Sequence, residues 1–150
     1  MLERQLQVYM KINELHSSSI HEDVVKMAEE GLAVAGELRS ARPARAAMIY
    51  RMLGECLCKL CEYVKGLRLL EQARALAVEA GERSVLGLVC LSLGYHQRGQ
   101  GKHAKAIVEY ELAGEIAVEL GYRRGEAIAI SGLGLNYMSL KQYDKAVELL

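Results

Sequence analysis

Apolar residues along this chain recur at spacings of three and four, the spacing that places them on one face of an α-helix. The pattern is clearest between Lys105 and Leu120, where its members are Ala106, Ile107, Tyr110, Ala113, Ala117 and Leu120. A second helix is predicted from Arg123 to about Leu140, with a buried side made of Ala127, Ile130, Leu133, Gly134 and Tyr137. Gly121 lies between the two helices and fits a helix C-cap. We therefore expect an all-α protein.

The helical pattern repeats every 40 residues. Gly54, Gly94 and Gly134 are 40 residues apart, and each follows a leucine. The same step relates several other sets of positions: Tyr63, His103 and Tyr143; Lys65, Lys105 and Lys145; Gly66, Ala106 and Ala146; Gly81 and Gly121. Agreement at so many positions in one register indicates an internal structural repeat and not a bias of composition.

Each period is predicted to contain two helices joined by a short turn, which makes the two helices antiparallel neighbours. The expected turns are residues 61–63, 101–103 and 141–143. The chain then forms a single array over residues 1–150, divided into a degenerate first helix pair (1–42), two repeats (43–82 and 83–122) and a truncated repeat (123–150). This division gives about seven helices plus a truncated eighth.

The first helix pair follows the repeat only loosely. Its helices are expected from about Leu2 to His16 and from Ile20 to Arg39, and Ser19 with Glu22 forms a capping box before the second. The last helix would begin near Tyr143 and be cut short, which leaves apolar surface uncovered. We read this as a fragment of a longer array or as an end that pairs with another molecule.

A glycine inside a helix is destabilising by about 1 kcal/mol relative to alanine, so three such glycines need a compensating contact. We expect Gly54, Gly94 and Gly134 to allow close backbone packing against the second helix of each pair, at Gly66, Ala106 and Ala146. On this interpretation Gly94→Leu overpacks the helix pair and destabilises it by about 1–3 kcal/mol.

The Leu-Gly pair, the small residue twelve positions later, and the further alanines Ala73 and Ala113 together resemble the tetratricopeptide repeat. The usual period of that family is 34 residues. The chain is similar to its longer, 40-residue branch, which includes spindle-orienting G-protein signalling modulators and bacterial peptide sensors. The stretch 120–127 looks like the linker of that branch. The resemblance covers residues 45–150 and implies a right-handed superhelical stack of antiparallel helix pairs that binds proteins or peptides.

In that family the first helix of each pair lines a concave face, and helical steps from the repeat glycines give the corresponding residues here. They are Met48, Arg51, Met52, Glu55, Cys58, Lys59, Leu88, Leu91, Ser92, Tyr95, Arg98, Ile128, Ser131, Leu135 and Met138. The carboxylate clamp of some family members is not expected, because Met52, Ser92 and Gly132 stand where its asparagines would be. Arg51, Lys59 and Arg98 are candidates to hold an acidic side chain of a ligand.

The composition limits the other function classes. The chain has 19 basic and 19 acidic residues, so no overall field attracts nucleic acid or anionic lipid. Neither a membrane span nor a signal peptide is recognisable, and we expect a cytoplasmic protein.

No catalytic or cofactor site is predicted. Cys58 and Cys61 have the spacing of a metal-binding pair, but no second pair completes a zinc site, and we expect small buried or half-buried thiols. The stretch 99–102 lacks the residues of a phosphate-binding loop, and the histidines have no nucleophile at a motif spacing. We therefore expect no enzyme activity, no metal and no cofactor.

The function predicted from the sequence is a scaffold that binds a peptide or a partner helix. Two alternatives are a self-associating module that forms homo-oligomers through its uncapped C-terminal end, and a regulatory repeat array of a larger multidomain protein.

Overall fold

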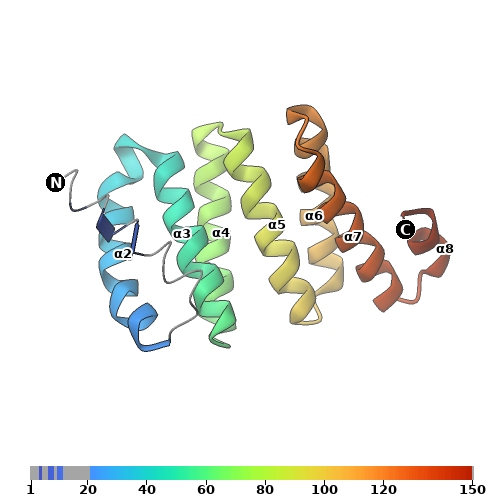
Figure 1. Cartoon of the computed structure of the whole chain (residues 1–150), viewed down its shortest axis with the longest axis horizontal. Coiled ribbons are helices and arrows are strands. Elements are labelled where there is room, and N and C mark those ends of the chain that lie inside the picture. Colours follow the sequence, from blue (N-terminus) through green and yellow to red (C-terminus); the bar gives the residue numbers. More distant parts are fainter. Residues whose placement is uncertain (1–3, 5–6, 9, 12–20, 150) are drawn as a thin grey trace. The chain divides into compact units, whose positions relative to one another are not determined.

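The structure, a computed structural model, describes residues 4, 7, 8, 10, 11 and 21–149, with the backbone alone at residues 21–29. In this part of the chain it contains helices and no strand, which confirms the all-α prediction (Figure 1). The described helices are α2 (His21–Ala41), α3 (Pro43–Lys59), α4 (Tyr63–Ala80), α5 (Arg83–Gly99), α6 (His103–Leu120), α7 (Arg123–Ser139) and α8 (Tyr143–Leu149). The helix predicted at residues 2–16 falls mostly outside the described residues, and so does Ser19 of the predicted capping box.

The chain divides into two compact units, Met1–Glu82 and Arg83–Leu150, here named unit 1 and unit 2. The division coincides with the predicted boundary between the repeats 43–82 and 83–122. Unit 1 contains α2, α3 and α4, and unit 2 contains α5 to α8. Within each unit, helices that follow one another in the sequence run antiparallel, as the short turns require (Figure 1).

The turns inside the helix pairs repeat one backbone hydrogen bond at 40-residue steps. The amide that follows each turn donates to a carbonyl in the last turn of the preceding helix: Glu62 to Leu57 at 2.9 Å, Lys102 to Gln97 at 2.8 Å and Gln142 to Tyr137 at 2.8 Å. The 40-residue periodicity of the sequence is therefore also a periodicity of local backbone structure.

The residue before that amide has a left-handed conformation in each turn. Its φ angle is 65° at Cys61, 74° at Gly101 and 60° at Lys141. Glycine adopts this region without strain, whereas a residue with a β-carbon is strained there by about 1–2 kcal/mol. The sequence has the favourable residue only at Gly101.

Helix ends follow the sequence signals. Gly121 has a φ of 67° and caps α6, as predicted, and Gly81 caps α4 in the same way with a φ of 66°. In both cases the next amide reaches back into the helix, and Tyr122 N–H donates to the carbonyl of Ala117 at 2.8 Å. Pro43 lies in the first turn of α3, where its missing N–H leaves no hydrogen bond unmade.

Close backbone packing occurs in unit 1 at the predicted glycines. A β-carbon on Gly54 would lie 2.8 Å from the carbonyl oxygen of Gly66, and one on Gly66 would lie 2.8 Å from that of Gly54. Real β-carbons are essentially never closer than 3.0 Å to such an atom. The predicted approach of α3 to α4 through Gly54 and Gly66 is therefore confirmed.

In unit 2 the neighbour of the repeat glycine is different from the one we predicted. The three atoms nearest to a β-carbon on Gly94 all belong to the ring of Tyr110, beginning with Cε2 at 2.9 Å. Ala106 is fully buried but is not among them. The glycine makes room here for an aromatic side chain, because α6 carries a tyrosine one turn beyond the alanine.

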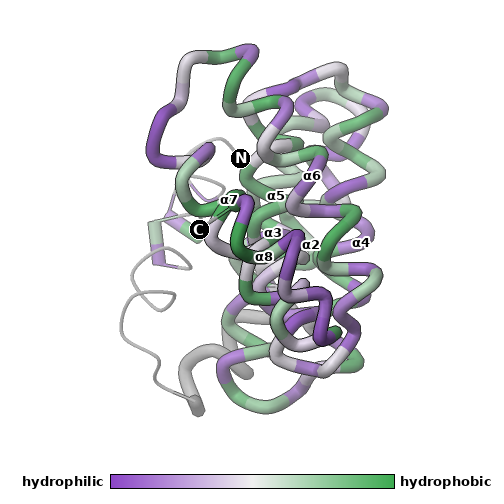
Figure 2. Tube along the Cα trace, turned by 90° about the vertical axis from the view of Figure 1, so that its right-hand side faces the viewer, coloured by the Kyte–Doolittle hydropathy of each residue, from purple (hydrophilic) through white to green (hydrophobic). Residues whose placement is uncertain are grey.

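Two further sequence predictions are wrong. Leu120 and Ala127, which we expected on buried faces of α6 and α7, are exposed. Apolar and polar residues do alternate along the helices (Figure 2), as expected for helices with one buried face. Leu120 and Ala127 nevertheless each line a pocket beside α5.

Candidate functional site

Two pockets of unit 2 lie between α5 and α7, and residues of α6 line both. We name the two pockets together the α5–α7 groove. On α5 their lining residues follow one face of the helix, with steps of three or four positions apart from the adjacent Gly87 and Leu88: Ser84, Gly87, Leu88, Leu91, Tyr95 and Arg98. Ser84, Gly87, Leu88 and Leu91 border one pocket, whereas Tyr95 and Arg98 border the other. The two pockets therefore follow one another along α5.

We name the pocket that Tyr95 and Arg98 border the Tyr–Arg pocket. It has a volume of about 320 Å³ and is lined by Tyr95, Arg98, Tyr110, Arg124, Ala127, Ile128, Ser131, Gly132 and Leu135. Five of the residues predicted to face a partner meet here: Tyr95, Arg98, Ile128, Ser131 and Leu135. Several apolar side chains at its edge face solvent, with exposed fractions of 58% for Tyr95, 42% for Ile128 and 41% for Leu135.

Tyr110 of α6 forms the floor of the Tyr–Arg pocket. Its ring lies between two glycines, since β-carbons on Gly94 of α5 and on Gly132 of α7 would both collide with it. The side chain is 2% exposed, and burial raises the pKa of the phenol, partly opposed by the charge and hydrogen bond of Arg98. Tyr110 is therefore a neutral, fixed wall of the pocket at physiological pH.

The charge of the pocket comes from Arg98 and Arg124. The guanidinium carbon of Arg98 lies 5.7 Å from the centroid of the Tyr95 ring, a cation–π contact that helps to orient it. Its Nε is buried without a hydrogen-bond partner in the described part of the chain. Among the described residues neither arginine forms an ion pair with a carboxylate. The pocket thus has a net positive charge without an internal counter-charge.

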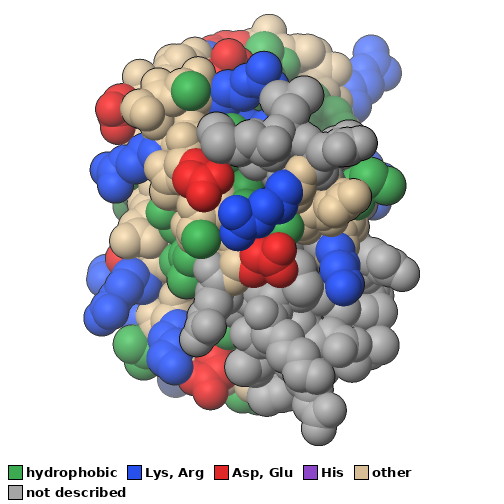
Figure 3. All heavy atoms as spheres, turned by 90° about the vertical axis from the view of Figure 1, so that its left-hand side faces the viewer, with side chains coloured by type: hydrophobic (Ala, Val, Ile, Leu, Met, Phe, Trp, Pro, Cys, Tyr) green, Lys and Arg blue, Asp and Glu red, His purple; other side chains and the backbone are tan. Residues whose placement is uncertain are grey.

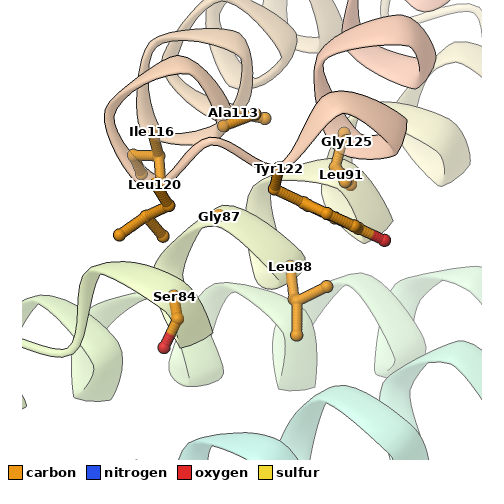
Figure 4. A pocket seen from close by; sticks show the side chains of 10 residues that line it. Ser84, Gly87, Leu88, Leu91, Ala113, Ile116, Leu120, Tyr122 and Gly125 are labelled. Atoms are coloured by element: carbon orange, nitrogen blue, oxygen red, sulfur yellow. The ribbon is translucent and has the colours of Figure 1, made fainter.

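We name the other pocket the apolar pocket. It also has a volume of about 320 Å³ and is lined by Ser84, Gly87, Leu88, Leu91, Ala113, Ile116, Ala117, Leu120, Tyr122 and Gly125. Figure 4 shows Ile116 and Leu120 on one side and Tyr122 on the other, with Gly87 of α5 between them. None of the described residues that line this pocket is charged.

Small residues shape the apolar pocket. The ring of Tyr122 lies over Gly125, because a β-carbon on Gly125 would be 2.8 Å from its Cε1. On the facing side a β-carbon on Gly87 would be 3.0 Å from Cγ2 of Ile116. Outside the lining, Arg83 and Glu119 neutralise each other, with Nη2–Oε1 at 2.7 Å and Nε–Oε2 at 3.1 Å.

The remaining predicted residues of unit 2 have mixed positions. Ser92 is buried, and its hydroxyl donates to the carbonyl of Leu88 at 3.2 Å, so it stabilises α5 locally. Met138 is exposed but borders neither pocket. Leu88 borders the apolar pocket.

The predicted residues of unit 1 differ in exposure. Met52 and Cys58 are buried, Met48 is half-buried and Lys59 is exposed. Arg51 forms an ion pair with Glu55 at 3.2 Å, one helical turn away on α3. The pair shows that Arg51 already has a carboxylate partner, which weakens its case as a ligand contact. Figure 3 shows a face of unit 1 on which basic and acidic side chains are interspersed.

The sequence did not identify Arg124, Tyr110 or Tyr122 as residues of a site. Arg124 and Tyr122 lie in the stretch that we interpreted as a linker. The sequence did contain one signal of the Tyr110 contact. Gly132 lies two positions before the repeat glycine Gly134, and the other repeats have no glycine at the corresponding position. A glycine without a repeat counterpart indicates a side chain that needs the space, here the ring of Tyr110.

The thiols differ in exposure. Cys56, Cys58 and Cys90 are buried, and burial raises the pKa of both Cys56 and Cys58 to about 11. Cys61 is exposed, contrary to the expectation of buried or half-buried thiols, because it lies in the turn between α3 and α4. Within the described residues, no three His, Cys, Asp or Glu side chains are grouped as a metal site would require.

In the part of the chain that the structure describes, no helix has the length and apolar character needed to cross a membrane. Comparison of the sequence with models of protein families gives no match, and comparison with curated proteins gives none either.

Proposed function

We propose that the protein is an interaction module that binds a peptide segment of a partner protein in the α5–α7 groove. The observation that carries the proposal is the Tyr–Arg pocket, where Tyr95, Ile128 and Leu135 expose apolar surface around a cavity with a fixed floor. Apolar side chains gathered at a groove, next to a few polar groups, are typical of protein and peptide binding sites.

The proposal extends to the type of repeat. The turn hydrogen bonds and the left-handed residues recur at the 40-residue step of the sequence, which supports a tetratricopeptide-like array. In such an array the helix pairs stack into a right-handed superhelix, and we expect the α5–α7 groove to belong to its concave face. The role is one of binding and not of catalysis.

The proposal can be tested with a displayed library of random 12-residue peptides, selected on the full chain. Peptides that bind are synthesised, and their Kd is measured for the wild type and for an Ile128→Ser, Leu135→Ser variant. Loss of two apolar contacts of about 1.5 kcal/mol each predicts a Kd higher by at least roughly tenfold.

The matched control is Val108→Ser, because Val108 is 56% exposed on α6 and borders neither pocket. It should leave the Kd unchanged, and circular dichroism should show equal helix content in all variants. Peptides that bind both variants like the wild type would place binding outside the groove and overturn the proposal. So would a concentration-dependent dimer that Ile128→Ser with Leu135→Ser converts to a monomer, because a second copy would then fill the groove.

A further inference from the structure

We infer that the segment bound in the α5–α7 groove carries an aliphatic or aromatic anchor for the apolar pocket and an acidic side chain for the Tyr–Arg pocket. The inference rests on the proposed function and specifies its ligand. It follows from the difference in chemistry between the two pockets.

The apolar pocket selects an uncharged anchor. A charge placed there would lose hydration without finding an opposite charge, because the described residues that line the pocket are all uncharged. The nearby ion pair of Arg83 with Glu119 is satisfied internally at 2.7 Å. The volume of about 320 Å³ is enough for one leucine, methionine or phenylalanine side chain.

The Tyr–Arg pocket selects a negative charge. Arg98 and Arg124 line it, no acidic residue does, and neither arginine is paired with a carboxylate in the described part of the chain. A carboxylate would accept charge-assisted hydrogen bonds from a guanidinium, which are about twice as strong as neutral ones. The hydroxyl of Ser131 adds a neutral donor beside them.

Along α5, the two pockets define a spacing between the anchor and a carboxylate that binds Arg98. The part of α5 at the apolar pocket is centred about nine residues before the part at the Tyr–Arg pocket, which is roughly 14 Å at 1.5 Å per residue. An extended peptide covers about 3.3 Å per residue. The anchor and the acidic residue are therefore expected about four positions apart in an extended segment.

A peptide fits the groove better than a nucleic acid does. Tight binding of nucleic acid requires many phosphate contacts along a basic stripe. Here two arginines line one pocket, and no charged residue of the described chain lines the other. A mixed apolar and acidic ligand matches both pockets.

The test uses synthetic peptides with capped ends, each with one leucine and one glutamate in a serine and glycine background, separated by one to eight positions in both orders. Binding to the full chain should be tightest at a separation of about four. Replacing the glutamate of the best peptide by glutamine should weaken binding by about threefold to tenfold, and added salt should do the same.

Variants of the protein assign each preference to its pocket. Arg98→Gln with Arg124→Gln should remove the preference for glutamate over glutamine, whereas Arg123→Gln, which changes an exposed neighbour outside the lining, should retain it. Leu120→Ser should remove the preference for leucine, and Val118→Ser, exposed on the same helix outside the pocket, should not.

The inference is overturned if the wild type binds glutamate and glutamine peptides equally, if the difference survives in the double arginine variant, or if a short single-stranded oligonucleotide competes more strongly than the best peptide. Library peptides that respond to Ile128→Ser with Leu135→Ser would then still support a peptide groove of other specificity. If those peptides do not respond either, the proposed function itself fails.

Discussion

The ring of Tyr110 packs directly on the backbone of Gly132, so that a β-carbon on this glycine would lie 2.5 Å from Cε1 of the tyrosine. The same ring meets Gly94 from the other side. One buried side chain of α6 thus occupies the space that two glycines leave in α5 and α7. Tyr110 sets how closely these helices approach and forms the floor of the Tyr–Arg pocket.

Gly132→Ala is expected to lower the free energy of unfolding by about 1–3 kcal/mol, because a fixed ring between two helices cannot move away from the new methyl group. The midpoint of chemical unfolding measures the change. Gly94→Leu should act in the same direction and by a similar amount, now through collision with Tyr110.

The matched control is Gly114→Ala on α6, where the added β-carbon would make an ordinary 3.5 Å contact with Cβ of Ala129. This change should be neutral or stabilising by up to about 1 kcal/mol, the difference in helix propensity. Tyr110→Leu should remove most of the added penalty of Gly132→Ala. If Gly132→Ala and Gly114→Ala are equally tolerated, the close packing of Tyr110 is wrong.

Lys141→Gly is expected to stabilise the protein by about 0.5–1 kcal/mol, because Lys141 has a φ of 60° and glycine relieves the strain of its β-carbon. Cys61→Gly should act similarly in the turn between α3 and α4. Gln142→Gly, one residue beyond the left-handed position, serves as the control and should bring no gain in the unfolding midpoint. A destabilised Lys141→Gly variant would contradict the left-handed conformation.

Asn136 joins α7 to the start of α6. Its Nδ2 donates to the carbonyl of Gly132 at 2.7 Å, so its Oδ1, 2.9 Å from Nδ1 of His103, accepts a hydrogen bond from the imidazole. Asn136 is fully buried, and Asn136→Ala should destabilise the protein by about 1–3 kcal/mol.

A double-mutant cycle with His103→Ala tests that contact and should give a coupling energy of about 0.5–1.5 kcal/mol. Ser139→Ala is the control for Asn136→Ala and should destabilise the protein less. Ser139 is exposed, and its hydroxyl donates to the carbonyl of Leu135 in the same helix. Simple additivity of the His103 and Asn136 variants would show that the two side chains act independently.

Alkaline pH is expected to destabilise unit 1 through Cys56 and Cys58. Burial raises their pKa from 9.0 to about 11, so between these values the unfolded chain loses thiol protons that the folded chain retains. The folded state therefore loses stability as the pH rises from about 9 to about 11, and the two thiols contribute nothing to pH dependence at neutral pH.

Urea titrations at neutral pH and near pH 10 measure this loss. Replacing Cys56 and Cys58 together by alanine should flatten the pH dependence, whereas Cys61→Ala should not, because Cys61 is exposed. A thiol reagent at neutral pH should correspondingly modify Cys61 first. Equal pH dependence in the wild type and the double variant would exclude the buried thiols as the cause.

The sequence by itself determined the helices of the described part of the chain, their antiparallel order within each unit, the cap at Gly121, and the contact of Gly54 with Gly66. These features are local or follow from periodicity, so hydrophobic spacing and turn residues are sufficient to predict them.

The tertiary structure alone decided which side chains meet across helices. It places Arg124 in the lining of the same pocket as Arg98, Tyr110 between Gly94 and Gly132, and His103 on Asn136. These contacts depend on the crossing of α5, α6 and α7 and on the direction of each side chain, and a repeat register does not contain that information. The left-handed conformation of Lys141 was also not predictable from the sequence. The geometry of a tight turn can impose this conformation on a residue that does not favour it.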